Sequence, residues 1–129
     1  MEKNINAAKE LLANYKAITL DQIIKIHAEI TEQEDIIPSG YDIMEKLTGF
    51  SSVSKCMLCQ EAQKLANNNH NFCKYCIYIN SDEIYDYYSC VNETYKALGE
   101  AYTPEKIYDA LQDRIEFLEQ SIVNYESQL

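Results

Sequence analysis

Two Cys-x-x-Cys pairs constrain the fold of this chain more than any other feature. Cys56 and Cys59 form the first pair, Cys73 and Cys76 form the second, and residues 60–72 separate them. Zinc binds thiolates tetrahedrally at about 2.3 Å, so two such pairs can supply all four ligands of one ion. The gap is slightly shorter than in the common four-cysteine pattern. We therefore predict a structural zinc site on these four cysteines.

Two other residues could replace one cysteine of the predicted site. His70 lies three residues before Cys73, and Cys90 follows the second pair. Cys90 is more simply explained as a small, buried apolar residue. Four thiolates could also hold an iron–sulfur cluster, although the Cys-x₂-Cys-x₂-Cys run of bacterial ferredoxins is missing.

Thiol chemistry offers a second class of function. Thioredoxin-like redox proteins use a Cys-x-x-Cys pair at a helix N-terminus, but no strand–helix–strand pattern surrounds either pair here. A zinc ion held by four cysteines has no open position for a substrate. The sequence also lacks a phosphate-binding loop, a His-Glu-x-x-His motif and a nucleophile elbow. We therefore expect a structural zinc protein and no enzyme, with a thiol–disulfide redox protein as the alternative.

The net charge of the chain limits the kinds of macromolecule that it can bind. The chain has 129 residues and a net charge of −10, so as a whole it should repel nucleic-acid phosphates. Only the segment 51–80 is locally basic, with Lys55, Lys64 and Lys74 against Glu61. Weak nucleic-acid binding through this segment is a further alternative. An acidic surface suits a basic protein partner, so we expect a protein-interaction or accessory module.

The same composition indicates a compartment. No apolar run is long enough to span a bilayer, and the first residues lack the apolar core of a secretory signal. We therefore expect a cytoplasmic protein that does not enter a membrane. Thiols stay reduced in that compartment, which favours metal ligation by the five cysteines over disulfides.

Apolar periodicity predicts a mainly α-helical fold, a small bundle forming one domain over residues 1–129 with a zinc-stapled segment at about 55–80. A hydrophobic content of 47% is enough for a core beyond the metal site. The expected helical stretches, with their caps, cover residues 4–17, 19–30, 41–48, 55–66, a tyrosine-rich stretch from Ser81 to about Leu98, and 103–125.

Cap residues and apolar stripes support these helices. Thr19 and Gln22 match a capping box, and Gly49 is placed to stop the third helix. The first helix carries an apolar stripe of Ile5, Ala8, Leu12 and Tyr15. His27, on the second helix, has no cysteine nearby in the sequence, so we expect it at the edge of the core or on the surface rather than in a metal site.

The last helix has the most regular pattern. Thr103 and Pro104 mark its start. Its apolar residues step by four and three: Leu111, Ile115, Leu118, Ile122 and Tyr125. We expect a core helix of the bundle, and the same heptad pattern would also support a homodimer through the helix at 104–125.

Overall fold

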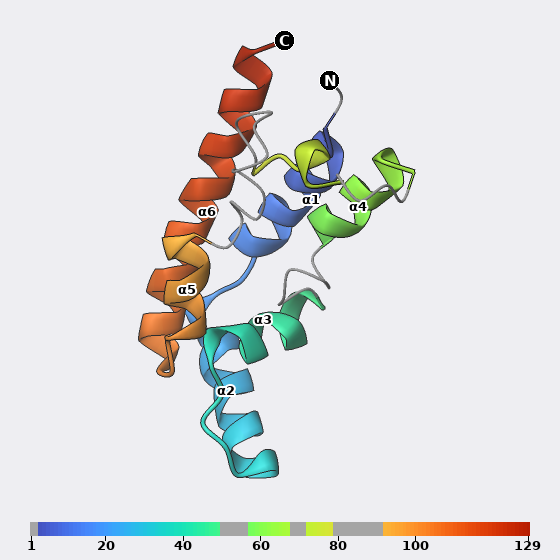
Figure 1. Ribbon diagram of the computed structural model, residues 1–129. Coiled ribbons are helices and arrows are strands. Elements are labelled where there is room, and N and C mark those ends of the chain that lie inside the picture. The colour runs from blue at the N-terminus through green and yellow to red at the C-terminus, as the bar shows by residue number, and fades with distance from the viewer. Residues whose placement is uncertain (1–2, 50–56, 68–71, 79–91) are drawn as a thin grey trace.

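A computed structural model of the chain describes residues 3–49, 57–67, 72–78 and 92–129 (Figure 1). Within these ranges the chain is mainly helical and has no strand, which confirms the predicted helical class. The elements are α1 (Ile5–Lys16), α2 (Leu20–Glu34), α3 (Gly40–Thr48), α4 (Met57–Leu65), the 3₁₀ helix η2 (Phe72–Tyr75), α5 (Glu93–Gly99) and α6 (Pro104–Ser127). No helix in the described ranges is long and apolar enough to cross a membrane.

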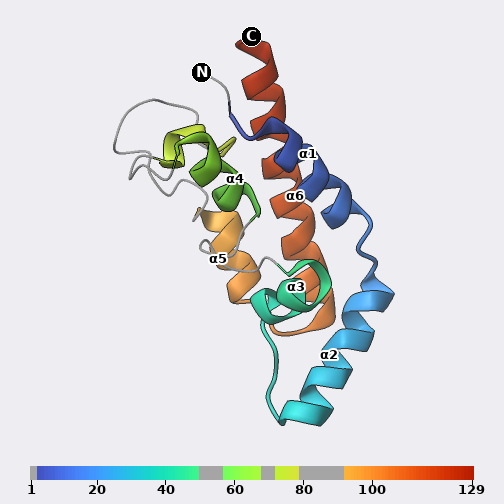
Figure 2. The same cartoon turned by 90° about the vertical axis from the view of Figure 1, so that its right-hand side faces the viewer.

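The long helix α6 is the element on which the others assemble. It packs against α1, α2 and α5, which lie along its length (Figures 1 and 2). The ion pairs Lys9–Glu126 and Lys16–Glu119, both 3.1 Å, show that α1 runs antiparallel to α6. The two chain ends therefore lie near each other at one end of the molecule (Figure 1).

Two regions can be separated by their contacts. α1, α2, α3, α5 and α6 form what we call the helical frame, in which α3 packs between α2 and α5. α4 and η2 pack against each other, and α4 also contacts α1. We call residues 57–67 and 72–78 the cysteine unit, because they carry the cysteines that the structure describes.

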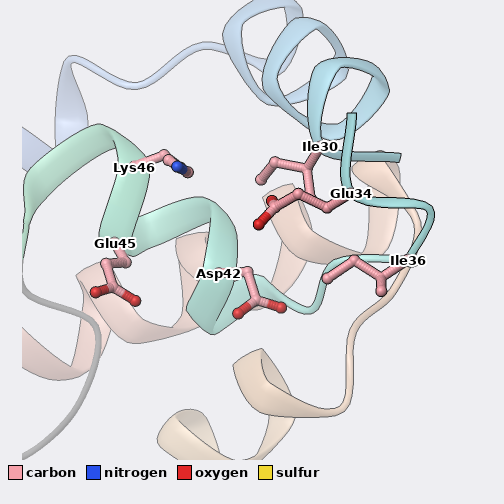
Figure 3. Close-up of a pocket in the computed structure, with 6 residues that line it drawn as sticks. All are labelled: Ile30, Glu34, Ile36, Asp42, Glu45 and Lys46. Atoms are coloured by element: carbon pink, nitrogen blue, oxygen red, sulfur yellow. The ribbon is translucent and has the colours of Figure 1, made fainter. Parts of the chain in front are cut away.

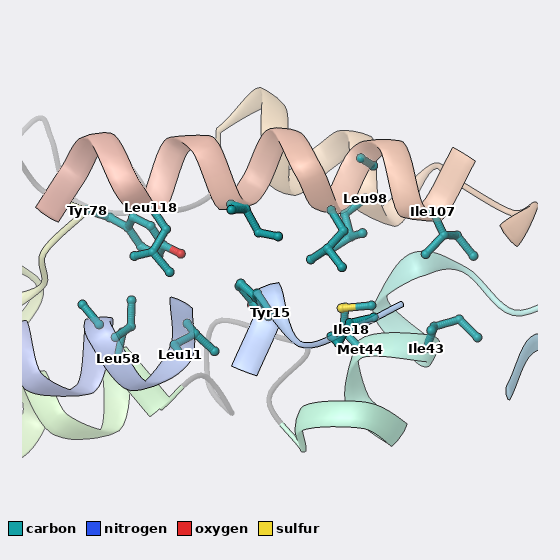
Figure 4. Packing of buried hydrophobic residues seen from close by; sticks show 14 of the residues in the cluster. Leu11, Tyr15, Ile18, Ile43, Met44, Leu58, Tyr78, Leu98, Ile107 and Leu118 are labelled. Carbon is teal, nitrogen blue, oxygen red and sulfur yellow. The ribbon is translucent and has the colours of Figure 1, made fainter. Parts of the chain in front are cut away.

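One hydrophobic core joins both regions. Leu11 of α1, Leu58 of α4 and Leu118 of α6 are each 0% exposed, and Figure 4 shows them meeting between these helices. Toward the other end of α6, Ile107 faces Ile43 and other residues of α3 (Figure 4). The cysteine unit therefore packs against the core of the frame and shares it.

Two helix starts in the frame, those of α2 and α6, follow the predicted cap chemistry. Thr19 and Gln22 form the capping box of α2, with hydrogen bonds of 2.8 and 3.2 Å between each side chain and the other's backbone N–H. Thr103 caps α6, and its Oγ1 accepts a hydrogen bond from the N–H of Lys106 at 3.4 Å. Gly49 ends α3 in the left-handed conformation, with φ of 78°. The bounds of α3 and α6 lie close to the predicted ones, whereas α2 runs on to Glu34, past its predicted end at residue 30.

Two expectations need correction. On α1, Leu11 is fully buried while Leu12 is only half-buried, so the true apolar stripe includes a residue that the predicted one missed. The tyrosine-rich stretch is not one helix, because Asn92 is extended and caps a new helix, α5. The residues of that stretch from 81 to 91 lie outside the described ranges, as does the start, at residues 55–56, of the helix expected over 55–66.

The regular apolar stripe of α6 is used inside the chain. Leu111, Ile115, Leu118 and Ile122 are at most 6% exposed, because α1, α2 and α5 cover this face of the helix. The prediction of a core helix is therefore confirmed. A homodimer through residues 104–125 stays a prediction, and it would have to use the outer face of α6, where Val123 is 57% exposed.

Candidate metal centre

The structure describes three of the four cysteines in the predicted site. Cys59 lies on α4 and is half-buried, Cys73 lies in η2 and is half-buried, and Cys76 follows η2 and is 8% exposed. All three are thiols and none forms a disulfide. Cys56 and the two substitute ligands, His70 and Cys90, lie outside the described residues.

The second pair lies in a tight turn of the chain. Cys73 lies within a 3₁₀ helix, and the backbone N–H of Cys76 donates a hydrogen bond to the carbonyl oxygen of Cys73 at 3.0 Å. Side chains three residues apart in a 3₁₀ helix lie one above the other. The Cys73–Cys76 turn is therefore of the kind that can present two thiols to the same ion.

Cys59, the member of the first pair that the structure describes, lies on the element packed against that turn. α4 and η2 are in contact along the cysteine unit, which places Cys59 on one element and the Cys73–Cys76 turn on its neighbour (Figures 1 and 2). Within α4, Nε2 of Gln63 donates a hydrogen bond to Sγ of Cys59 at 3.5 Å. The fold thus makes neighbours of two segments that the sequence separates.

A buried asparagine ties the two cysteine-bearing segments together. Asn4 is 2% exposed, and its Nδ2 donates a hydrogen bond to the carbonyl oxygen of Leu58 at 2.6 Å. Its Oδ1 accepts from the N–H of Ile77 at 2.8 Å, and its own N–H donates to the carbonyl oxygen of Tyr75 at 3.0 Å. Leu58 is next to Cys59, and Tyr75 and Ile77 flank Cys76. One residue therefore links the backbones on both sides of the candidate site.

Sequence reasoning did not find the role of Asn4. The residue occupies the N-cap position of α1, where an asparagine side chain normally accepts a hydrogen bond from the first turn. Here the side chain makes no capping hydrogen bond, because it is committed to Leu58 and Ile77 instead. Only the long-range fold reveals this, since the two partners lie 54 and 73 positions away along the chain.

The described thiols have the right chemistry for zinc but are not gathered into one cluster. Soft thiolates are the ligands that zinc prefers in structural sites. Among the residues that the structure describes, however, no three His, Cys, Asp or Glu side chains form a group that could hold a metal ion. The residues therefore fit the ion by chemistry and by the pairing of their elements. Coordination would require Cys59 to converge with the Cys73–Cys76 turn.

A second residue missed by the sequence is the buried arginine of α6. Arg114 is 5% exposed, and its Nη1 donates to Oδ1 of Asn92 at 3.2 Å and to Oγ1 of Thr94 at 3.0 Å. Its guanidinium carbon lies 4.5 Å from the ring centroid of Tyr78, and that ring stacks on Phe117 at 4.9 Å. Cation–π contacts of this kind stabilise by about 0.5–2 kcal/mol. Arg114 thus joins the end of the cysteine unit to α5 and α6.

Two other predicted features can be placed. Nε2 of His27 is 2.7 Å from the carbonyl oxygen of Tyr102, and the side chain is half-buried at the edge of the core, as expected. In the locally basic segment, Nζ of Lys64 is 3.9 Å from a carboxylate oxygen of Glu61 on the same helix. Lys55 lies outside the described residues, so nucleic-acid binding through this segment stays a prediction.

Comparison with protein-family models, curated proteins and solved structures gave no match for this chain. Its function must therefore be argued from its own residues.

Proposed function

We propose that this chain is a zinc-stapled helical module that acts by contacting another protein. Cys56, Cys59, Cys73 and Cys76 would hold one Zn²⁺ in a closed, four-thiolate site. Such a site leaves no coordination position for a substrate, so the ion would stabilise the cysteine unit and take no part in a reaction. A reducing compartment, the cytoplasm, would keep the thiols available to the metal.

The observation that carries this proposal is the pairing of α4 with η2 through Asn4. Two Cys-x-x-Cys pairs are a metal motif only if the fold brings them together. Asn4 bonds to Leu58 beside the first pair and to Ile77 beside the second, at 2.6 and 2.8 Å. These hydrogen bonds hold the two backbones next to each other. This arrangement supports a site at this place more strongly than the spacing alone.

The protein-interaction part rests on charge. A net charge of −10 gives the surface a negative potential, which favours a basic protein over a nucleic acid or a second copy of the chain. A structural zinc site suits such a module, because it stiffens a small segment without requiring a larger core.

The test is elemental analysis of protein purified without chelators. We expect one zinc per chain and no stoichiometric iron, together with thiols that react with a thiol reagent only after chelation. Cys59→Ser and Cys73→Ser should each lose the metal. Cys90→Ser is the matched control, because it removes a thiol outside the proposed set and should keep the zinc.

Other outcomes would replace the proposal. Loss of zinc in Cys90→Ser alone would make Cys90 a ligand, and stoichiometric iron would indicate an iron–sulfur cluster. Wild-type protein that is folded, metal-free and readily oxidised to a Cys-x-x-Cys disulfide would favour the redox alternative.

A further inference from the structure

A pocket opens between the end of α2 and the start of α3, on the side of the frame away from the cysteine unit (Figures 1 and 3). Its volume is about 430 Å³. Ile30, which is 4% exposed, forms part of its inner wall, and Ile36, which is 49% exposed, forms part of its rim. Glu34 of α2 and Asp42 of α3 extend toward the same opening (Figure 3). The pocket thus has an apolar wall and carboxylates at its mouth.

The charges at the end of α2 are placed against its dipole. The C-terminal end of a helix carries a partial negative charge, and basic residues normally complement it. α2 instead ends on Glu32 and Glu34, is followed by Asp35, and has no basic residue in its last turn. Acidic groups at this end destabilise a helix, so these residues reduce the stability of the last turn of α2. A cation bound at the pocket would relieve this repulsion.

Three carboxylates line the pocket, and two of them, Glu34 and Asp42, have capacity for a ligand; Glu45 is the third. Oδ2 of Asp42 accepts hydrogen bonds from the N–H and the hydroxyl of Ser39, at 3.0 and 3.3 Å. Within the part of the chain that the structure describes, no hydrogen bond uses Oδ1 of Asp42, and no ion pair involves Glu34. Lys46 also lines the pocket but makes no ion pair with either carboxylate in these ranges.

We infer that this pocket docks a lysine or arginine side chain of a basic protein partner. Such a side chain has an aliphatic stem and a charged head. The stem would lie along Ile30 and Ile36, and the head would lie between Glu34 and Asp42, where charge-assisted hydrogen bonds to carboxylates are strongest. Ile37, 66% exposed beside Ile36, would add apolar contact for the residues next to the docked one.

Other occupants fit the same surface less well. A second copy of the chain carries a net charge of −10 and would be repelled from an acidic mouth. The phosphates of a nucleic acid would be repelled for the same reason. A bare metal ion is disfavoured because no three acidic, His or Cys side chains group together in the described residues, this pocket included.

The inference deepens the proposed function and rests on its protein-interaction part, since it names the surface and the chemistry of the partner. It does not depend on the zinc site, which lies in a different region. The test can therefore separate the two by measuring zinc content in the same samples.

The experiment is a titration of the full chain, with isotope-labelled isoleucine methyl groups, against butylguanidinium chloride. This probe has the stem and head of an arginine side chain. We expect saturable NMR shifts at the methyls of Ile30 and Ile36, with no shift at Ile115 in the distant core. Butylurea, which has the same shape but no charge, should give no saturable shift. Because exposed ion pairs are screened, the binding should weaken as salt is raised.

Variants assign the binding to the pocket. Glu34→Gln keeps the size of the side chain and touches no cap, and it should weaken binding by about threefold or more. Asp42→Asn should weaken it further, but this residue also caps α3, so Glu34→Gln is the decisive variant. Glu10→Gln on α1 is the matched control, because it removes one exposed charge elsewhere and should leave the affinity unchanged.

Equal shifts with butylurea, or equal loss of affinity in Glu10→Gln and Glu34→Gln, would overturn the inference. Zinc-loaded protein that gives no shift at Ile30 and Ile36 would overturn it too, while leaving the zinc site standing. Protein that contains no zinc when purified without chelators, and that still binds the probe, would contradict only the proposed metal centre.

Discussion

The helical frame and the cysteine unit are held together by different kinds of interaction. In the frame, long helices bury regular apolar stripes and begin at side-chain caps, as α6 does with Leu118 and Thr103. In the cysteine unit, α4 has nine residues and η2 has four, too few to be stable by themselves. Their positions depend on contact with α1, on hydrogen bonds to Asn4 and, in our proposal, on a metal ion.

This difference indicates that stability and specificity have different sources in the two regions. Burial of apolar area stabilises the frame without fixing single contacts. Polar groups in the cysteine unit are buried with specific partners, so each lost partner leaves an unsatisfied group behind. Frame variants should therefore change global stability, while variants of the cysteine unit should change local order and metal binding.

The largest effect is expected from truncating the core of the frame. Leu118→Ala removes a side chain that is 0% exposed and should lower the free energy of unfolding by about 2–5 kcal/mol. Chemical denaturation measures this directly. Val123→Ala on the same helix, at a site 57% exposed, is the control and should change stability by about 0.5 kcal/mol or less. Similar losses in both variants would mean that α6 is not the core helix.

Removing the link between the two segments should have the next largest effect. Asn4→Ala deletes both side-chain hydrogen bonds and leaves the N–H of Ile77 without its partner, at about 1–3 kcal/mol. Zinc affinity, measured by competition with a chromogenic chelator, should fall in parallel. Asn4→Asp keeps an acceptor for Ile77 but sets a carboxylate oxygen against the carbonyl oxygen of Leu58 in a buried site, so it should not restore stability. Unchanged zinc affinity in Asn4→Ala would separate this residue from the metal centre.

Close backbone packing in the frame predicts a smaller effect at a glycine. A Cβ added at Gly40 would overlap the carbonyl oxygen and side chain of Leu98, where α3 meets α5. Gly40→Ala should therefore cost about 1–3 kcal/mol by overpacking. Gly49→Ala meets nothing within 4 Å and is strained only by its φ of 78°, so it should cost about 1 kcal/mol. The reverse order in denaturant midpoints would contradict the α3–α5 contact.

The smallest effect is a pH dependence at the same contact. Burial raises the pKa of Tyr41 from 10.0 to about 12, and the neighbouring Tyr95 adds to the shift. Because the folded state holds this proton more tightly than the unfolded state, the contribution is complete below pH 10 and is lost as the pH rises toward 12. Tyr41→Phe should show a weaker fall in stability across this range. Identical alkaline profiles for wild type and Tyr41→Phe would refute the prediction.

Much of the frame could be predicted from the sequence because its signals are local. The capping box at Thr19, the stop at Gly49 and the stripe of α6 depend on residues within a few positions of one another. The break at Asn92 was missed because an asparagine does not by itself mark a helix start. It does so only when its side chain accepts a hydrogen bond from a backbone N–H of the next turn, as Asn92 does.

The candidate site was predictable only in part. The spacing of the Cys-x-x-Cys pairs predicts a metal site. Nothing near Asn4 in the sequence, however, indicates that its side chain joins Leu58 to Ile77. Arg114 escaped notice for a similar reason, because its aromatic and polar partners come from Tyr78 and α5. Long-range polar contacts leave no periodic trace in a sequence, whereas apolar stripes do.

Hydrogen exchange of zinc-loaded and chelated protein tests the central claim most directly. If zinc is held by the two cysteine pairs, chelation should remove amide protection from residues 57–67 and 72–78 and leave that of α6 largely intact. The reason is that α6 is stabilised by its own apolar face against α1, α2 and α5. Uniform loss across all helices would mean that the metal holds the entire fold together. Unchanged protection in the cysteine unit would contradict the account, because those cysteines could then not be the metal site.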